Sequence, residues 1–310
     1  MRLGYFTAAL LLQAAAGGSL SRDVRQAAGE RDFVRGEALI QQYRTRVGIT
    51  AEMIEALSWL GRGALDSRDH GRAEAYAAET HKLALQQLKA RRLDDERRLP
   101  IALGAAIEVK AQVMAARSER SGAIEYLRRE LAVYKDTSIR SRIQKNIHLL
   151  SLEGKPAPPL DVREWLGPKP ASLAELRGRP VLLFFWAHWC GDCKYQGPIL
   201  ARLKAELGPQ GLVLVGPTQR YGYAARGEDA SPEQEAKYID EVRRRYYADL
   251  VDMPAPLSAG NFTGYGASTT PTLVLIDRAG IVRLYHPGEM PYEELAPRVA
   301  RVVSDIPVGR

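Results

Sequence analysis

Cysteine is scarce in this sequence, because only two of its 310 residues are cysteines. So few thiols exclude a framework of several structural disulfides and a zinc site built from four cysteines. The five histidines include no pair at the three-to-five-residue spacing of common zinc sites, which excludes a mixed site as well. Both cysteines instead lie in one segment, Cys190-Gly191-Asp192-Cys193. We therefore expect a chemical role for the pair and no bound metal.

Basic charge is plentiful but not concentrated. The net charge is +7 and the isoelectric point is near 9.4, yet Arg243-Arg244-Arg245 is the only tight cluster. A nucleic-acid site needs basic side chains gathered on one surface, whereas a single cluster is typical of a solvated helix face. The sequence therefore predicts no nucleic-acid partner. With 45% hydrophobic and 26% charged residues, the chain is an ordinary globular one with room for two domains.

The apolar stretch at the start of the chain, Leu3 to Ala16, is too short and too rich in small residues for a firm membrane span. The basic start Met1-Arg2 precedes it, and Ala14-Ala15-Ala16-Gly17 offers a small-residue cleavage site. We expect residues 1–20 to be a signal peptide and the protein to be extracytoplasmic, either periplasmic or secreted. The alternative is a first packed helix of an N-terminal domain. No cysteine follows this stretch, so no lipoprotein anchor is expected.

Strand signals are absent from about Arg31 to Ser151, where we expect an all-α domain over residues 31–151. Apolar residues recur there every three or four positions, and Gly, Asp or Pro separates the segments. The predicted helices are Phe33 to Arg46, Ala51 to Arg68, Arg72 to Arg91, Leu99 to Arg117, Gly122 to Tyr134 and Thr137 to Leu150.

Two pairs of these helices resemble tetratricopeptide hairpins. Small and apolar residues stand at that family's spacing: Leu57, Leu60, Gly61 and Ala64 before Ala73 and Ala77, and Ile107, Ala111 and Met114 before Ala123 and Leu127. Gly61 and Ala111 lie 50 residues apart, whereas one such repeat has about 34 residues. The resemblance implies close helix pairs and a surface that recruits or orients a protein partner. A generic helical bundle is the alternative.

The helical region ends at the proline-rich segment Lys155-Pro156-Ala157-Pro158-Pro159, which cannot continue a helix. We place a domain boundary near residue 154 and a second domain over residues 154–306. There the pattern predicts an α/β architecture, with a tight hairpin turn at 277–280 and a closing helix over Pro291 to Val303. Its expected strands are Val181 to Trp186, Leu212 to Gly216, Thr272 to Ile276 and Ile281 to Tyr285.

The cysteine pair lies where a predicted strand gives way to a predicted helix over Lys194 to Leu207. A helix N-terminus carries free backbone N–H groups and the positive end of the helix dipole, and both stabilise a thiolate relative to a thiol. Cys190 is therefore the expected nucleophile, and Cys193 is the expected resolving thiol. The alternative is that the two cysteines are simply buried as small apolar residues, and a Trp-Cys-x-x-Cys-Lys string at such a junction argues against it.

The segment Phe185 to Lys194, FWAHWCGDCK, resembles the active-site string of thioredoxin. Pro198 falls at that family's kink proline, and Thr270-Pro271 falls where the family has a cis-proline before a strand. Gly288 matches a glycine that lines the same groove. The resemblance implies a thioredoxin fold, a central mixed sheet flanked by helices, and a substrate groove formed by Trp189, Gly191, Asp192, Thr270 and Pro271.

Within this family the chain is most similar to the extracytoplasmic TlpA and ResA type. That type begins with a Gly-x-x-Ala-Pro segment, here Gly154 to Pro158, and carries an insertion in mid-fold, here Tyr221 to Leu257. Ser231 and Pro232 mark the N-cap and first turn of a helix that we expect to reach Tyr247. The residues that follow the second expected strand, Thr218 to Tyr221, either line the groove or simply start the inserted loop.

The chain departs from the family at several tuning positions. Phe184 replaces the buried acid of thioredoxin, and Gln196 replaces the acid that ResA-like proteins carry, so no obvious buried carboxylate is left to move the proton of Cys193. Asp192 opposes a thiolate at Cys190 through like charge, while His188 and Lys194 act in the opposite sense. We expect His188 to be a partly exposed groove residue and not a catalytic base.

These features predict a thiol-disulfide oxidoreductase that exchanges disulfides or dithiols with protein partners and with a redox donor or acceptor. Its redox-active group is the Cys190–Cys193 disulfide, and no dissociable cofactor is expected. A thiol peroxidase is one alternative, although Ala187 stands where peroxiredoxins place a threonine. A binding scaffold with incidental thiols is the other.

Overall fold

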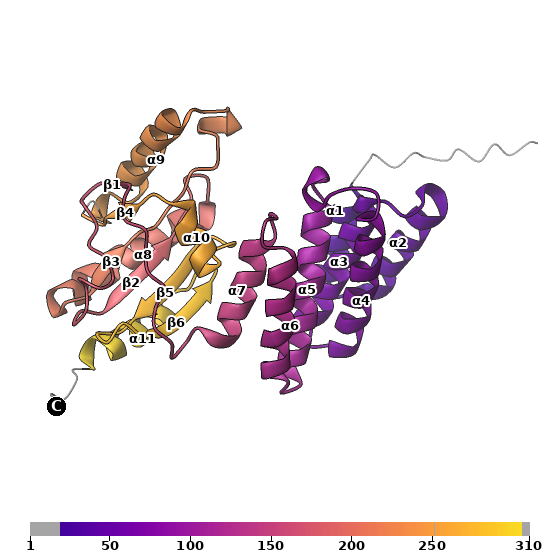
Figure 1. Cartoon of the computed structure of the whole chain (residues 1–310), viewed down its shortest axis with the longest axis horizontal. Helices are drawn as coiled ribbons and strands as arrows, with labels where there is room; N and C mark the ends of the chain where they lie inside the picture. Colours follow the sequence, from indigo (N-terminus) through magenta and orange to yellow (C-terminus); the bar gives the residue numbers. More distant parts are fainter. Residues whose placement is uncertain (1–18, 251, 306–310) are drawn as a thin grey trace, which may run out of the picture. The chain divides into compact units, whose positions relative to one another are not determined.

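The computed structural model describes residues 19–250 and 252–305 (Figure 1). The chain divides into two compact units, Met1–Val109 and Lys110–Arg310. This division falls inside helix α5 (Leu99–Ala116) and does not coincide with the boundary predicted near residue 154. The secondary structure does change from helices to strands and helices near residue 154, as the sequence predicts. The two units differ from the predicted domains because they are defined by tertiary contacts. These contacts assign the last helices before residue 154 to the second unit.

The first unit is helical. It contains α1 (Leu20–Gly29), α2 (Phe33–Val47), α3 (Ala51–Asp66), α4 (His70–Gln87) and the first part of α5. Gly61 of α3 lies against α4, because a Cβ at Gly61 would be 3.6 Å from the Cβ of Tyr76. Packing of this predicted pair is therefore confirmed, while the tetratricopeptide resemblance stays a prediction. Helix α1 was not predicted. Residues 1–18 of the expected signal peptide lie outside the described residues.

One helix of the described residues, α5, is long and apolar enough to cross a membrane by length and composition alone. Its mean hydropathy is 1.4, and 56% of it is buried in the structure. The core helix of a packed domain has the same properties.

Helix α7 (Arg140–Ser151) connects the helical region to the rest of the second unit. It packs against α10 (Ala259–Tyr265) and β6 (Val282–Pro287). The Nε2 atom of His148 lies 2.9 Å from the carbonyl oxygen of Gly264, and its ring meets that of Tyr285 edge-on at 5.6 Å. The chain after α7 adds a further contact, because the N–H of Tyr285 donates to the Glu153 carboxylate. These contacts explain why α7, together with α6 (Arg120–Val133), belongs to the second unit.

The second unit is built on a mixed four-stranded sheet with the order β3-β2-β5-β6. Strands β2 (Val181–Phe185) and β3 (Val213–Val215) are parallel, whereas β2 pairs with β5 (Thr272–Ile276), and β5 with β6, in antiparallel fashion. All four predicted strands are confirmed, each within two residues of its expected bounds. This strand order, with helices packed on both faces of the sheet, is the architecture that the resemblance to thioredoxin implies.

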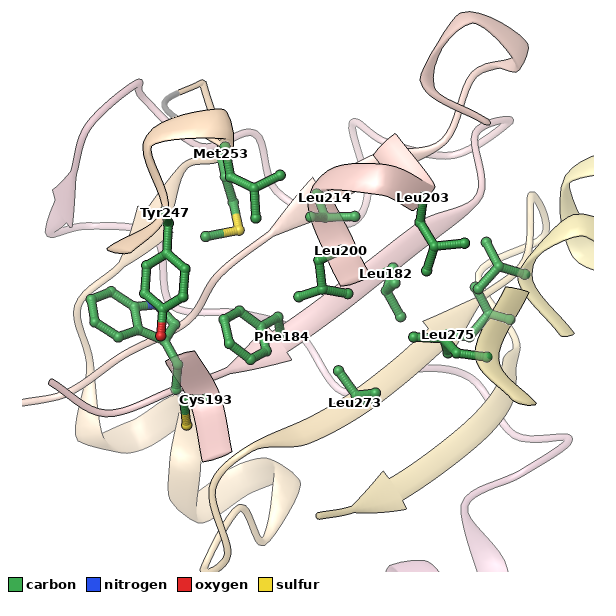
Figure 2. Close-up of a cluster of buried hydrophobic side chains, with 14 of the residues drawn as sticks. Leu182, Phe184, Cys193, Leu200, Leu203, Leu214, Tyr247, Met253, Leu273 and Leu275 are labelled. Carbon is green, nitrogen blue, oxygen red and sulfur yellow. The ribbon is translucent and has the colours of Figure 1, made fainter. Parts of the chain in front are cut away.

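Alternating residues of β2 face opposite sides of the sheet, as the two-residue period of a strand requires. Leu182 and Phe184 join a core that includes α8 (Gly191–Leu207) and α11 (Tyr292–Ser304), and Figure 2 shows this cluster. Leu183 and Phe185 join the core on the other face, where Phe262 of α10 packs. The strand next to the cysteines is therefore buried on both faces.

The expected insertion contains a helix, α9 (Pro232–Tyr246), which begins at the predicted N-cap Ser231 with a capping box. After it, β4 (Ala255–Pro256) pairs with β1 (Trp165–Leu166) in a small antiparallel sheet that the sequence did not predict. Residues of the insertion, among them Ile239, Val242, Tyr247 and Met253, enter the same core as α8. The insertion is therefore part of the core and not a surface loop.

Replacing Gly266 with alanine should destabilise the second unit. Gly266 ends α10 at φ +60°, and a Cβ there would lie 2.3 Å from the backbone nitrogen of Lys145 in α7. We expect a loss of about 2 kcal/mol of unfolding free energy, from left-handed strain together with the backbone clash. The midpoint of thermal unfolding should fall by about 5 °C.

Gly264→Ala is the matched control, because a Cβ at Gly264 meets no atom within 4 Å. This variant should unfold at or slightly above the wild-type temperature, since alanine favours a helix more than glycine does. If Gly266→Ala were as stable as wild type, the packing of α7 against α10 would be wrong.

Candidate active site

The pairing of β2 with β5 brings the two halves of the site together. Phe185, the last residue of β2, is opposite Thr272, the first residue of β5. The chain leaving β2 reaches Cys190 five residues later, while Pro271 directly precedes β5. As a result, the Cys190 Sγ atom lies 3.4 Å from the carbonyl oxygen of Thr270. The Thr270–Pro271 peptide bond is cis, as predicted.

Cys190 is the N-cap of α8, and it forms a disulfide with Cys193. The backbone N–H of Cys193 donates a hydrogen bond to Cys190 Sγ at 3.0 Å. The same N–H would stabilise a Cys190 thiolate after the disulfide opens, and the helix dipole acts in the same direction. Cys190 is 3% exposed and Cys193 is fully buried, so the outer sulfur belongs to Cys190.

Buried hydrogen bonds hold the segment between β2 and the cysteines. The Trp186 indole N–H donates to the Gly216 carbonyl at 2.9 Å, and the Thr218 hydroxyl donates to the Trp186 carbonyl at 2.9 Å. Thr218 is itself fully buried, so it supports the segment from beneath and does not line a groove. The residues that follow β3 therefore fix the position of the cysteine pair.

The exposed face beside Cys190 is aromatic. Trp189 is 50% exposed, and its ring meets that of Tyr221 edge-on at 5.5 Å. Gly191 and Asp192 are exposed at the start of α8, and Pro271, which follows Thr270, is buried. The structure thus places the predicted groove residues next to Cys190 in sequence or in space, and Tyr221, the first residue of the insertion, reaches the same face.

His188 is buried, so the expectation of a partly exposed groove residue is wrong. Its side chain is 1% exposed, and its Nε2 atom lies 3.3 Å from a carboxylate oxygen of Glu235 in α9. The rings of three tyrosines meet the imidazole edge-on at 5.2 to 5.6 Å: Tyr221, Tyr223 and Tyr238. The insertion supplies all of these partners, which local sequence could not show.

Glu235 is a buried carboxylate that the sequence analysis missed. Its side chain is 1% exposed, and it accepts hydrogen bonds from the N–H groups of Tyr221 and Gly222 as well as facing His188. The helical pattern of α9 marks Glu235 as an ordinary helix residue, because nothing in it shows which face is turned inward.

Burial lowers the pKa of His188, although the nearby Glu235 carboxylate acts in the opposite sense. The imidazole is therefore neutral near pH 7, and its Nε2–H tautomer donates to Glu235. A neutral imidazole adds no positive charge beside Cys190. Its role in this geometry is to attach the active-site segment to the insertion.

Gln196 is fully buried and is bonded twice to one backbone unit. Its amide N–H donates to the Met290 carbonyl at 3.1 Å, and its amide oxygen accepts the Met290 N–H at 2.8 Å. In this way it connects α8 to the loop after β6. In that loop the Gly288 N–H donates to the Pro271 carbonyl at 2.8 Å, so Gly288 lies beside the cis-proline as predicted.

Lys194 and Phe184 are two other positions at which the sequence suggested an influence on the cysteines, and both contact residues at the C-terminal end of α9. The Lys194 ammonium lies 4.3 Å from the centre of the Tyr246 ring, a cation–π contact. The Phe184 ring meets that of Tyr247 edge-on at 5.7 Å in the core. Within the described residues, no group of three or more His, Cys, Asp and Glu side chains could hold a metal ion.

The buried His188 should make stability depend on pH. Because its folded pKa is lowered, the unfolded chain binds a proton more readily, and stability falls as the pH drops below about 6.5. One such group contributes a slope of about 1.4 kcal/mol per pH unit. His188→Gln, which keeps a donor for Glu235, should reduce the loss of thermal stability between pH 7 and 5.5.

His286→Gln is the control, because that imidazole lies near the surface. Its pH dependence should match that of the wild type, in which buried His148 contributes a second slope of the same sign. If His188→Gln loses stability as steeply as wild type, the assigned neutral state of His188 is incorrect.

Comparisons with known proteins agree with this geometry. The AhpC/TSA family model matches residues 154–220. The chain is 29% identical over 147 residues to the thioredoxin-like protein YneN of Bacillus subtilis, which covers 46% of this chain and 76% of that protein. It is 30% identical over 142 residues to the thiol:disulfide interchange protein DsbE of Escherichia coli K12, covering 45% of this chain and 68% of that protein.

A crystal structure of a thiol-disulfide isomerase from Corynebacterium glutamicum aligns with 49% of this chain and 98% of that one, at 20% identity and a TM-score of 0.40. The length and identity of the match to the Escherichia coli protein show the family. The chain belongs to the thioredoxin-like thiol:disulfide interchange proteins of the DsbE type and is a thiol-disulfide oxidoreductase.

Proposed function

We propose that this protein exchanges disulfides with protein partners through Cys190 as the nucleophile and Cys193 as the resolving thiol. The single observation that carries the proposal is the N-cap geometry of Cys190, whose Sγ accepts the Cys193 N–H at 3.0 Å. In the reduced protein the Cys190 thiolate attacks a partner disulfide, and one partner sulfur leaves. Cys193 then attacks Cys190, which closes the protein disulfide and releases the second partner sulfur as a thiol.

The partner's chain docks beside Thr270 and the cis-proline. Thr270 O lies next to the Cys190 sulfur, and Trp189 and Tyr221 form an aromatic wall at the same sulfur. An extended segment lying along Thr270 would present its cysteine sulfur to Cys190, while its neighbouring side chains contact the exposed Trp189 ring. This arrangement favours a protein partner over a small thiol.

The helical region before residue 154 selects or orients that partner. Its first unit is a packed set of helices with exposed apolar side chains, among them Val34 and Val47. The family and the apolar, small-residue start of the sequence support an extracytoplasmic location, where a single exchangeable disulfide can persist. A redox donor or acceptor in that compartment restores the starting state.

Cys190→Ser should abolish disulfide exchange, because the first sulfur bond can no longer form. Cys193→Ser should keep the first step and lose the second, so mixed disulfides between Cys190 and partner proteins should accumulate. Non-reducing gel electrophoresis of protein incubated with a disulfide-bonded substrate detects both results, and a reductant should release the trapped partner.

A thiol peroxidase would instead consume peroxide in a Cys190-dependent reaction, which the same variants can test. Exchange activity that survives in Cys190→Ser would overturn the assignment of the nucleophile. Full biological activity after replacement of both cysteines would leave the chain as a binding scaffold.

A further inference from the structure

Tyr247, the C-cap residue of α9 in the insertion, has a buried hydroxyl group without a hydrogen-bond partner. Tyr247 is only 2% exposed, and its hydroxyl group forms no hydrogen bond with any described residue. Buried hydroxyl groups are nearly always paired, since an unpaired one sacrifices its bonds to water. An orphaned hydroxyl in a redox protein therefore calls for a partner that is present in another state.

The Tyr247 ring lies against the first turns of α8. A Cβ on Gly197 would be 2.9 Å from Cδ1 and 3.0 Å from Cε1 of this ring, so only glycine accommodates it there. Gly197 is four residues after Cys193 and shares its helix face, and side chains on a helix lean towards its N-terminus. Figure 2 shows the hydroxyl end of Tyr247 directed towards Cys193.

The surroundings of Cys193 otherwise offer few donors for its sulfur. Cys193 and Tyr247 share one apolar cluster with Phe184 and Trp186. The Trp186 indole N–H already bonds the Gly216 carbonyl. The Gln196 amide bonds Met290 at both ends. Among the described residues around the pair, two buried hydroxyl groups lack a hydrogen-bond partner: that of Thr270, on the Cys190 side, and that of Tyr247, within the cluster that contains Cys193.

Other charged groups lie around the pair. Asp192 and Lys194 are its neighbours on α8, Asp192 being exposed and Lys194 half-buried. His188 and Glu235 are occupied with each other and with backbone N–H groups. Burial also raises the pKa of Tyr247, so the phenol keeps its proton and is able to donate it in a hydrogen bond.

We propose that the Tyr247 hydroxyl donates a hydrogen bond to the Cys193 sulfur when the disulfide is open, and thereby stabilises the thiolate that resolves the mixed disulfide. This inference rests on the proposed function. Cys193 loses its proton to water, and its electron pair forms the new bond to Cys190 Sγ. The bond between Cys190 and the partner sulfur breaks, and that sulfur leaves with its electron pair and takes up a proton. Tyr247 keeps its own proton throughout.

Tyr247→Phe tests the proposal, because it keeps the ring and removes only the hydroxyl. Reduced protein is mixed with one equivalent of 5,5′-dithiobis(2-nitrobenzoate), which releases one coloured thiolate when Cys190 attacks and a second when Cys193 resolves. In Tyr247→Phe the second phase should slow about tenfold at pH 7, and its pH midpoint should rise by about one unit. The first phase should keep its wild-type rate.

The equilibrium between the dithiol and disulfide forms should also change in Tyr247→Phe. A hydroxyl that pairs only in the reduced form stabilises that form, so its loss should favour the disulfide. We expect about a tenfold change in the equilibrium constant with glutathione, which corresponds to about 30 mV towards more reducing potentials. A merely structural role for the ring would leave both the potential and the pH midpoint unchanged.

Tyr246→Phe is the matched control, since the same change is made one residue away on an exposed ring. It should leave both phases as in wild type. Gly197→Ala is a second variant, because its Cβ must displace the Tyr247 ring. It should slow the second phase, and it should add no further slowing to Tyr247→Phe.

A wild-type second phase and potential in Tyr247→Phe would overturn this inference and leave the proposed function intact. The absence of any Cys190-dependent first phase in the wild-type protein would instead refute the proposed function.

Discussion

The antiparallel pairing of β2 with β5 is the constraint on which the site depends. It places the end of one strand beside the start of the other, with Phe185 opposite Thr272. The cysteines follow the first strand and the cis-proline precedes the second, so this pairing brings segments 80 residues apart to within 3.4 Å. Burial on both faces of β2 makes the register costly to change, because a one-residue shift would exchange the residues that face the two cores.

The insertion is the second structural determinant of the active centre. It contributes Glu235 beneath the segment that leads to Cys190, and it contributes Tyr247 against the helix that carries Cys193. Both side chains are almost completely buried. A thioredoxin core without this insertion would leave His188 without its carboxylate and would leave a void beside Gly197. In this chain the insertion is therefore a structural part of the active site and not a peripheral addition.

The last helix before the sheet is packed tightly against the second unit's other elements. Helix α7 contacts α10 and β6 through His148, and Gly266 must lack a side chain because the α7 backbone occupies the space. Helix α10 ends shortly before Thr270 and Pro271. The last helix before residue 154 thus supports, through α10, the segment that lies beside the catalytic sulfur.

Much of the fold and site could be predicted from sequence because the signals are local. Hydrophobic periodicity identified the four central strands and most helices within a few residues, and the cysteine motif at a strand-to-helix junction identified the N-cap sulfur. The hydrogen bond from the Cys193 N–H to Cys190 is a local contact over three residues. The cis-proline followed from resemblance to the family. The burial of His188 was beyond local sequence, since its carboxylate partner is 47 residues away.

The sequence by itself determined the chemistry of this protein: two thiols, their spacing and their place at a helix N-terminus follow from residues within a few positions of one another. Only the tertiary structure decided what surrounds them. Which face of α9 turns inward, which helix joins the second unit and where the Tyr247 ring lies all depend on contacts between distant segments. Such contacts form when elements pack to bury apolar surface, and no short stretch of sequence records its eventual neighbours.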